Sequence, residues 1–246
     1  MSLKEMSPKG ITADEMLARV LHRDGLMLIV DKPAGLPVHR GPKGGASLED
    51  YFDALRFGLP RAPSLAHRLD KDTSGCLVLG RHRKALAHLG LLFKHGKIGK
   101  TYWAMVEGGP QVDEGIIDLA LGRLDETRGW WMKPDPKGLP SVTTWKVLGR
   151  GGAPNAELTW LTLTPVTGRT HQLRVHCAAM GWPIVGDTIY GTAPRVGGPI
   201  QQLHAREVVV PISRNKPPVR VAAPVPPHMR ERLAACGWNG EDGPVQ

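Results

Sequence analysis

Short runs of apolar residues, separated by turn-forming residues, recur along the chain in a pattern typical of strands. Residues 76–79 read Cys-Leu-Val-Leu between two glycines, and residues 26–30 read Leu-Met-Leu-Ile-Val. Both runs predict buried strands, because each is too short for a core helix. Further strands are predicted at residues 97–106, 157–164 and 208–212.

Alternation within residues 97–106 assigns the side chains to two faces of the predicted strand. Trp103 and Met105 share one face, and Lys100, Tyr102 and Ala104 share the other. A cation beside a phenol could contact a nucleotide. The alternative is an ordinary half-exposed tyrosine next to a solvated lysine.

Apolar residues at helical spacing, together with start and stop signals, predict three helices in the first hundred residues. A capping box at residues 12–15 opens a helix that runs to Leu21. Ser47 begins a second helix that ends at Gly58, and residues 83–95 form the third.

A fourth helix is predicted at residues 169–180, with Gly181 as its stop. His171 and Arg174 are three residues apart, so they are expected on one face of this helix. The apolar face is expected to hold three other residues, Leu173, Cys177 and Met180.

Two segments are less regular. Residues 123–140 are rich in charge, Pro and Gly but contain Trp130 and Trp131, which could stack on bases or belong to a hairpin packed on the core. The proline-rich residues 214–227 are predicted to run extended over the surface. A short helix follows, and residues 237–246 are expected to fray.

Composition indicates a globular protein with a basic surface. The 246 residues are 41% hydrophobic, which is enough for a full core. A net charge of +9 predicts attraction to a polyanion such as nucleic acid, although a basic surface can also be inert.

Cysteine usage and the apolar runs bear on the compartment. The three cysteines suit neither a disulfide framework nor a zinc cluster, which favours a reducing cytoplasm. No run approaches the ~20 apolar residues of a membrane span. Residues 1–5 lack the apolar core of a signal peptide.

The loop at residues 66–75 is the strongest candidate for chemistry. It carries two acids and three basic groups and leads directly into the predicted strand at residues 76–79. A loop held by a buried strand can fix a reactive side chain, and Asp70 is the candidate. The alternative is a purely structural role, in which Asp70 forms an ion pair with Arg68 or Lys71.

Other chemistries find less support. His171, His176, Asp187 and His204 could bind a metal, but five residues separate the first two histidines, which on a helix places them about 140° apart. Paired cysteines and a His-Glu-x-x-His motif are absent, so we predict no metal site. Phosphate-loop, dinucleotide and serine-hydrolase motifs are also absent.

Asp70, Tyr102 and Arg174 remain as the candidate set. A carboxylate sealed from water by a bound partner needs an adjacent cation to stay ionised. Arg174 could supply a planar, two-pronged partner. Spacing alone does not show that these residues meet in space.

Five ordered motifs carry a resemblance to the RluA-type RNA pseudouridine synthases. Residues 67–75, His-Arg-Leu-Asp-Lys-Asp-Thr-Ser-Gly, and 168–176, Gly-Arg-Thr-His-Gln-Leu-Arg-Val-His, resemble its signatures. The segments 29–35, 100–104 and 183–187 with 203–205 match further motifs in the family's order. Trp182 departs from the pattern, since the family often has His there.

The resemblance implies isomerisation of uridine to pseudouridine in structured RNA, without a metal or any other cofactor. Asp70 would be the catalytic aspartate, attacking either the ribose C1′ or the base, and Arg174 would pair with it. Tyr102 would stack on the base and assist proton removal. Arg68 would enter the RNA where the flipped base leaves.

The remaining site residues follow from the same resemblance. We expect His67, Lys100, Arg169 and His171 to contact RNA. Leu203 and Ile184 are the expected apolar residues beside the base.

The implied fold is α+β, with a long, bent, mainly antiparallel sheet, helices packed outside it and a cleft across its middle. We expect one catalytic domain over residues 1–246, with its core at about 24–227, a tail at 229–246 and no separate S4 RNA-binding domain. The protein is expected to act as a cytoplasmic monomer on tRNA or a large-subunit rRNA hairpin, away from membranes.

Two rival functions remain open. The first is an RNA-binding relative that has lost catalysis, against which the joint presence of Asp70, Tyr102 and Arg174 argues. The second is a metal-dependent phosphoesterase built on the histidines.

Overall fold

The computed structural model describes residues 11–41, 44–125, 127, 130–153, 156–213 and 215–241. The expectations for residues 1–5 and for the end of the tail, 242–246, fall outside these described residues. The chain divides into two compact units. Unit 1 comprises Met1–Ile98 and Glu207–Ala223, and unit 2 comprises Gly99–Arg206 and Pro224–Gln246.

Unit 1 is built on antiparallel strands. Its ladder has the order β1 (Val20–Arg23), β2 (Met27–Lys32) and β4 (Ser74–Gly80), and β3 (Ser64–Leu65) also pairs with β4. Both buried strands predicted from apolar runs are confirmed. All seven residues of β4 are buried, so the loop before it leads directly into the core.

A hairpin formed by distant residues completes the strands of unit 1. β11 (Leu203–Val210) begins in unit 2, and its last four residues, in unit 1, pair with β12 (Val219–Ala222). The predicted extended course of residues 214–227 agrees with β12, whose residues are exposed or half-buried, but the stretch does not lie wholly on the surface. Ala223 and Val225, which follow β12, are 0% and 1% exposed.

The helices of unit 1 follow the predictions in part. α1 (Ala13–Ala18) begins with the predicted capping box, but it ends before Leu21 because the chain there enters β1. The predicted helix after Ser47 is instead two 3₁₀ turns, η1 (Leu48–Tyr51) and η2 (Ala54–Arg56).

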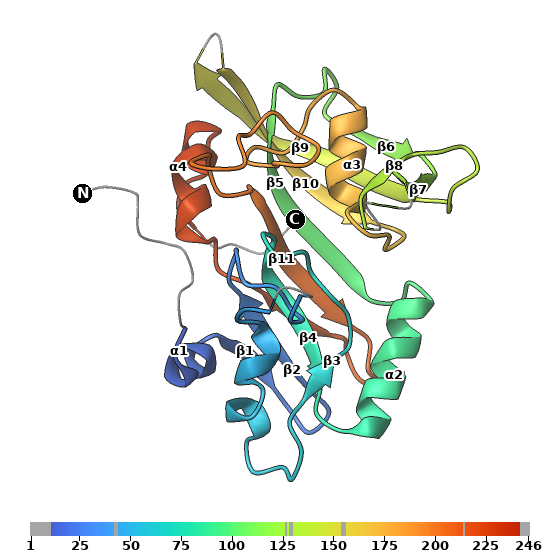
Figure 1. The fold of residues 1–246 in the computed structure, drawn as a ribbon, viewed down its shortest axis with the longest axis vertical. Helices are drawn as coiled ribbons and strands as arrows, with labels where there is room; N and C mark the ends of the chain where they lie inside the picture. The colour runs from blue at the N-terminus through green and yellow to red at the C-terminus, as the bar shows by residue number, and fades with distance from the viewer. Residues whose placement is uncertain are drawn as a thin grey trace. The chain divides into compact units, whose positions relative to one another are not determined.

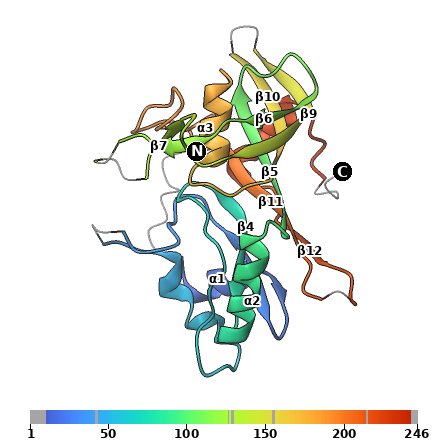
Figure 2. The ribbon, with the colours of Figure 1, turned by 90° about the vertical axis from the view of Figure 1, so that its right-hand side faces the viewer.

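Helix α2 (Arg83–Lys94) confirms the helix predicted at residues 83–95 almost to the residue. Figure 2 shows this helix facing the viewer. Its apolar residues join the core of unit 1. Leu89 is buried in one cluster with Ile29 from β2, Val78 from β4 and Val208 from β11.

Unit 2 centres on a four-stranded antiparallel ladder (Figure 1). Its order is β5 (Gly99–Glu107), β10 (Ala156–Pro165), β9 (Val142–Ala153) and β6 (Glu114–Asp118). A separate hairpin of β7 (Leu121–Arg123) and β8 (Met132–Pro134) confirms the hairpin interpretation of residues 123–140. Trp130, in the connection between the two strands, is 60% exposed, so the expected packing of this ring on the core is wrong.

Helices α3 (Gln172–Ala179) and α4 (Pro227–Ala235) contribute to two separate cores. Ala104 of β5 belongs to the cluster that includes Leu173 of α3. Trp103 belongs to the cluster that includes Met229 of α4. The predicted alternation of faces along β5 is thereby confirmed.

Two local features of unit 2 differ from the predictions. α3 begins at Gln172 rather than at 169, because His171 has a left-handed backbone (φ 53°) that no helix can include. Met180, placed on its apolar face by the pattern, is 46% exposed.

The long strand β9 was not predicted, because Gly149, Gly151 and Gly152 interrupt its apolar pattern. The fold explains two of these glycines. A Cβ on Gly149 would lie 1.8 Å from the carbonyl oxygen of Cys236, and one on Gly151 would lie 2.0 Å from that of Ala235. The end of α4 therefore sits directly on the backbone of β9.

Candidate active site

In unit 1, the loop that carries Asp70 is a tight, supported turn. The N–H of Thr73 donates to the carbonyl oxygen of Asp70 (3.2 Å), and Leu69 is 5% exposed. Asp70 itself is half-buried. The side chains of Arg68 and Lys71 are exposed and form no ion pair with any residue that the structure describes.

The buried side chain of Lys32 attaches this loop to the core. It is 0% exposed, and its ammonium donates to the carbonyl oxygens of Pro33 (2.8 Å), Leu36 (2.8 Å) and Lys71 (2.9 Å). The N–H of Gly35 donates to the same Lys71 oxygen (3.0 Å). One buried cation thus joins the turn after β2 to the loop of Asp70.

Burial lowers the pKa of Lys32 to about 7, although the charges of Asp72 and Asp70 act in the opposite direction. Lys32 lies in the family motif at residues 29–35, but the sequence predicted no role for it. The available signal was a cation directly after a buried apolar strand, a position that is rarely occupied without partners.

We expect the free energy of unfolding of the wild type to rise with pH relative to that of Lys32→Met. Between about pH 7 and 10 the unfolded chain holds the Lys32 proton more tightly than the folded protein, so deprotonation favours folding. From pH 7 to 8.5 the difference should grow by about 1.5 kcal/mol. Urea unfolding at several pH values measures it, with Lys32→Arg as a variant that keeps the charge. Parallel pH profiles for wild type and Lys32→Met would contradict the assignment.

His67 anchors the start of the loop. Its Nε2 accepts the N–H of Val78 in β4 (3.0 Å), and its ring stacks on Phe93 of α2 with centroids 4.4 Å apart. A backbone N–H can only donate, so the acceptor Nε2 carries no proton. The predicted RNA contact of His67 stays a prediction beside this anchoring role.

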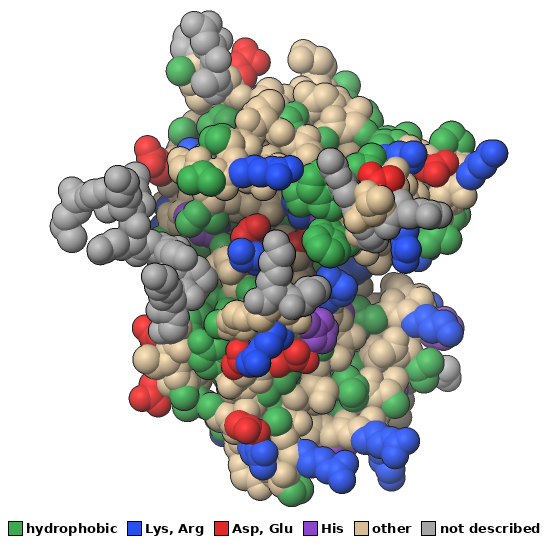
Figure 3. Space-filling model, viewed as in Figure 1, with side chains coloured by type: hydrophobic (Ala, Val, Ile, Leu, Met, Phe, Trp, Pro, Cys, Tyr) green, Lys and Arg blue, Asp and Glu red, His purple; other side chains and the backbone are tan. Residues whose placement is uncertain are grey.

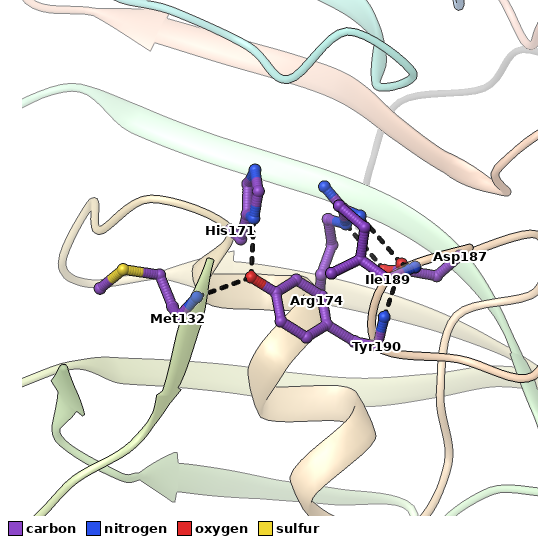
Figure 4. A network of polar contacts seen from close by, with 6 residues as sticks. All are labelled: Met132, His171, Arg174, Asp187, Ile189 and Tyr190. Carbon is purple, nitrogen blue, oxygen red and sulfur yellow. Dashed lines mark hydrogen bonds and ion pairs between the residues drawn. The ribbon is translucent and has the colours of Figure 1, made fainter. Parts of the chain in front are cut away.

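In unit 2, Arg174 is held by a buried carboxylate (Figure 4). Its Nε donates to Oδ2 of Asp187 (2.7 Å) and its Nη2 to Oδ1 (2.9 Å), and both side chains are less than 10% exposed. Oδ1 also accepts the N–H groups of Ile189 (2.9 Å) and Tyr190 (3.0 Å).

These donors ensure that the carboxylate is ionised. Burial acts to raise the pKa of Asp187, but Arg174 and the two N–H groups outweigh it and hold the pKa below its usual range. Asp187 lies in the family motif at residues 183–187, but the only role predicted for it from the sequence was that of a possible metal ligand. Its partner is the guanidinium of Arg174, and the sequence spacing carried no signal for that pair.

Tyr190, which sequence analysis missed, connects three parts of unit 2 (Figure 4). Its hydroxyl accepts the N–H of Met132 in β8 (2.9 Å) and shares a hydrogen bond with Nδ1 of His171 (2.8 Å). The guanidinium carbon of Arg174 lies 5.2 Å from its ring centroid. His171 and Arg174 are therefore brought together through Tyr190 rather than on one helix face.

The other polar residues of α3 are bound within the fold. Gln172 accepts from Thr167 and Arg169 and donates to Val142 and Thr143. His176 is 0% exposed, and burial lowers its pKa. Among the described residues, no three His, Cys, Asp or Glu are grouped to hold a metal ion.

Tyr102 and Lys100 lie on the predicted face of β5. Tyr102 packs against the cluster that contains Ile184 and Leu203, which are 1% and 3% exposed, so these two residues are part of the core beside it. Burial lowers the pKa of Lys100, whose ammonium lies 3.6 Å from the position of a Cβ on Gly168. The turn before α3 thus adjoins this cation.

The structure also locates Arg169, a predicted RNA contact, and Trp182, which departs from the family pattern. Arg169 donates from Nε to the carbonyl oxygen of Pro140 (3.2 Å) and is partly exposed. Trp182 is a core residue whose ring meets Trp145 edge to face at 5.7 Å. Asp70 belongs to unit 1, and Tyr102 and Arg174 belong to unit 2, so their convergence on one substrate stays a prediction. None of the helices in the described ranges has the length and apolar character to cross a membrane.

Comparison with known proteins supports the resemblance. Residues 26–179 match the family model described as RNA pseudouridylate synthase. The chain is 44% identical over 210 residues to an uncharacterized RNA pseudouridine synthase of Zymomonas mobilis, an alignment that covers 85% of this chain and 94% of that protein. It is 34% identical to the ribosomal large subunit pseudouridine synthase C of Vibrio cholerae, covering 87% and 68% of the two chains.

A solved structure agrees with the fold. The human RNA pseudouridylate synthase domain containing 1 superposes with a TM-score of 0.71 and 29% identity, covering 89% of this chain and 86% of that one. The predicted α+β class is confirmed by this match and by the strands and helices described above. The chain therefore belongs to the RluA-type RNA pseudouridine synthases, a family of isomerases that act on RNA.

Proposed function

We propose that this protein isomerises a specific uridine in a structured RNA, either a tRNA or a large-subunit rRNA hairpin, with Asp70 as the catalytic carboxylate. The observation that carries the proposal is the support of the Asp70 loop. Lys32 holds the backbone of the loop and His67 holds its start, while Asp70 itself is only half-buried. A reactive group needs this rigid placement within reach of a substrate.

The reaction rearranges bonds without net oxidation. The C1′–N1 bond breaks, the base turns, and a C1′–C5 bond forms, while C5 loses a proton and N1 gains one. All of these atoms are shielded in stacked RNA, so the nucleotide must be extruded at a cost of roughly a few kcal/mol. The exposed Arg68 side chain is proposed to fill the gap that the base leaves and to offset part of that cost.

The proposed roles divide between Asp70, Tyr102 and Arg174. Asp70 acts as a nucleophile at C1′ or the base, or starts a glycal route, and each path splits one difficult step into two easier ones. Arg174, aligned by Asp187, is proposed to pair with Asp70 and to keep it ionised. Tyr102 is proposed to stack on the base and to assist removal of the C5 proton.

The remaining expectations complete the proposal. Lys100, Arg169 and His171 are proposed to contact the RNA, and the core residues Ile184 and Leu203 to support the base pocket. The three cysteines are buried and form no disulfide within the described residues, which fits our proposal that the protein works in a reducing cytoplasm.

Mapping of carbodiimide-reactive positions in tRNA and rRNA, from cells with and without the gene, tests the proposal. We expect one or a few uridines to lose the pseudouridine signal when the gene is absent, and purified protein to restore it on RNA from the deletion strain. Identical maps, with no restoration in vitro, would favour a relative that binds RNA without modifying it.

A further inference from the structure

Helix α2 lies in a segment without acidic residues. Between Thr73 and Val106 the chain has six Lys or Arg residues and neither Asp nor Glu. Four of these cations, Arg83, Lys84, Lys94 and Lys97, are exposed, and none forms an ion pair with any residue in the described ranges. We call the surface that they form, on and directly after α2, the basic α2 face.

This face is separate from the side of the helix that packs on the core. At 100° per residue, the exposed positions from Arg83 to His95 fall within an arc of about 160°. Ala85 and Leu89, on the opposite side, are 4% and 1% exposed. The cations therefore serve no packing role, and the apolar side of α2 is not available to enter a membrane.

The placement of two of the cations opposes helix stability. Arg83 and Lys84 occupy the first turn of α2, which has no acidic residue, and His82 caps it. The positive end of the helix dipole lies there, so both charges are unfavourable for the helix. Local conflicts of this kind are expected where a surface serves binding rather than folding.

The neighbouring segment of unit 1 is also free of acids. Residues 208–223 contain none, and His88 of α2 hydrogen-bonds the carbonyl oxygen of Ile212 within this segment (3.2 Å). Figure 3 shows Lys and Arg side chains, and no acidic ones, over the region that Figure 1 labels α2. The positive potential of the helix is thus not cancelled by the element beside it.

The basic α2 face is continuous with the candidate active-site loop. His67, three residues before Asp70, stacks on Phe93, and Lys94 follows directly. Arg83 lies eleven residues before Lys94, about 16 Å away along the helix axis at 1.5 Å per residue. A strand that enters at the Asp70 loop could therefore follow a line of cations away from it.

We infer that the basic α2 face binds the phosphodiester backbone of the substrate RNA outside the modified nucleotide. The inference rests on the proposed function, because it assumes that Asp70 marks where the RNA enters. Unpaired, exposed cations spaced along one face match a polyanion, and such contacts supply affinity without reading sequence.

The first test compares two double variants with the same change in net charge. Lys84→Gln/Lys94→Gln removes two cations from the face. Lys146→Gln/Arg150→Gln removes two exposed cations of β9 that already pair with Glu114 and Asp113. The probe is a fluorescent, unmodified tRNA transcript, titrated at 50–300 mM salt.

We expect Lys84→Gln/Lys94→Gln to weaken binding roughly tenfold, and to reduce the slope of log affinity against log salt by about 1.5. The single-turnover rate at saturating RNA should stay at the wild-type value. A slope equal to that of the Lys146→Gln/Arg150→Gln control would overturn the inference. The titration measures RNA binding and needs no turnover. It therefore tests the basic α2 face even if Asp70 proves not to be catalytic.

A second variant separates binding from structure. Lys84→Glu places an acid in the first turn of α2, so its melting temperature should be equal to or above that of the wild type. Its affinity for the transcript should nevertheless fall at least as far as that of the double variant. An RNA affinity of Lys84→Glu equal to that of the wild type would reject RNA as the partner of this face. So would a Lys84→Glu protein that keeps its RNA affinity but no longer sediments with phosphatidylserine vesicles.

Discussion

Asp70→Asn is expected to abolish pseudouridine formation while the protein remains folded and bound to RNA. Asparagine keeps the shape of the side chain, so the loop held by Lys32 and the stack of His67 on Phe93 should persist. It lacks the charge and the nucleophilic oxygen that the reaction needs. Removal of a catalytic nucleophile lowers rates by at least about 10³-fold in well-studied enzymes.

The measurement is a single-turnover assay that follows release of tritium from C5-labelled uridine in a substrate RNA. Asp72→Asn, two residues away on an exposed position of the same loop, is the matched control and should retain most activity. Binding of Asp70→Asn to the same RNA should stay within about threefold of wild type, since phosphate contacts supply most of the affinity. Substantial turnover by Asp70→Asn would reject the mechanism.

Asp187→Ala is expected to give the largest loss of stability. The buried guanidinium of Arg174 would lose both of its bonds to Asp187, and breaking a buried pair in this way costs about 3–5 kcal/mol. For a chain of this length the melting temperature should fall by about 10 °C. Differential scanning calorimetry or urea unfolding measures the change.

Two comparisons make this prediction specific. Asp113→Ala, which breaks the exposed pair with Arg150, should cost less than about 1 kcal/mol. The pKa of Asp187 is lowered by Arg174, so its contribution is fully present above about pH 4 and is lost as the pH falls through the lowered value. The stabilities of wild type and Asp187→Ala should therefore converge at low pH; equal stabilities at pH 7 would show that the pair contributes nothing.

Local patterns were enough to predict much of the fold. The apolar run at residues 76–79 and the spacing of residues 83–95 correspond to β4 and α2, because both elements bury residues at regular intervals. Strand β9 was missed because Gly149 and Gly151 are set by the approach of α4, almost ninety residues away. No local window contains that constraint.

In the candidate site, too, local motifs predicted some residues, while others depend on contacts that only folding creates. Asp70, Tyr102 and Arg174 could be named from motifs, and the family they indicate is confirmed. The residues that hold them in place were not predicted. Asp187 resembled a metal ligand, and Tyr190 and Lys32 gave no sign of their partners, because those partners are main-chain atoms or side chains brought close only by folding.

The way in which Lys32 holds the Asp70 loop has a consequence for sequence drift. All three of its hydrogen bonds end on main-chain oxygens, which every amino acid possesses. The exposed side chain at position 71 can therefore vary between lineages while the tether to its backbone persists. A change at position 32 removes all three bonds at once, so tolerance to substitution is unequal at the two ends of the tether.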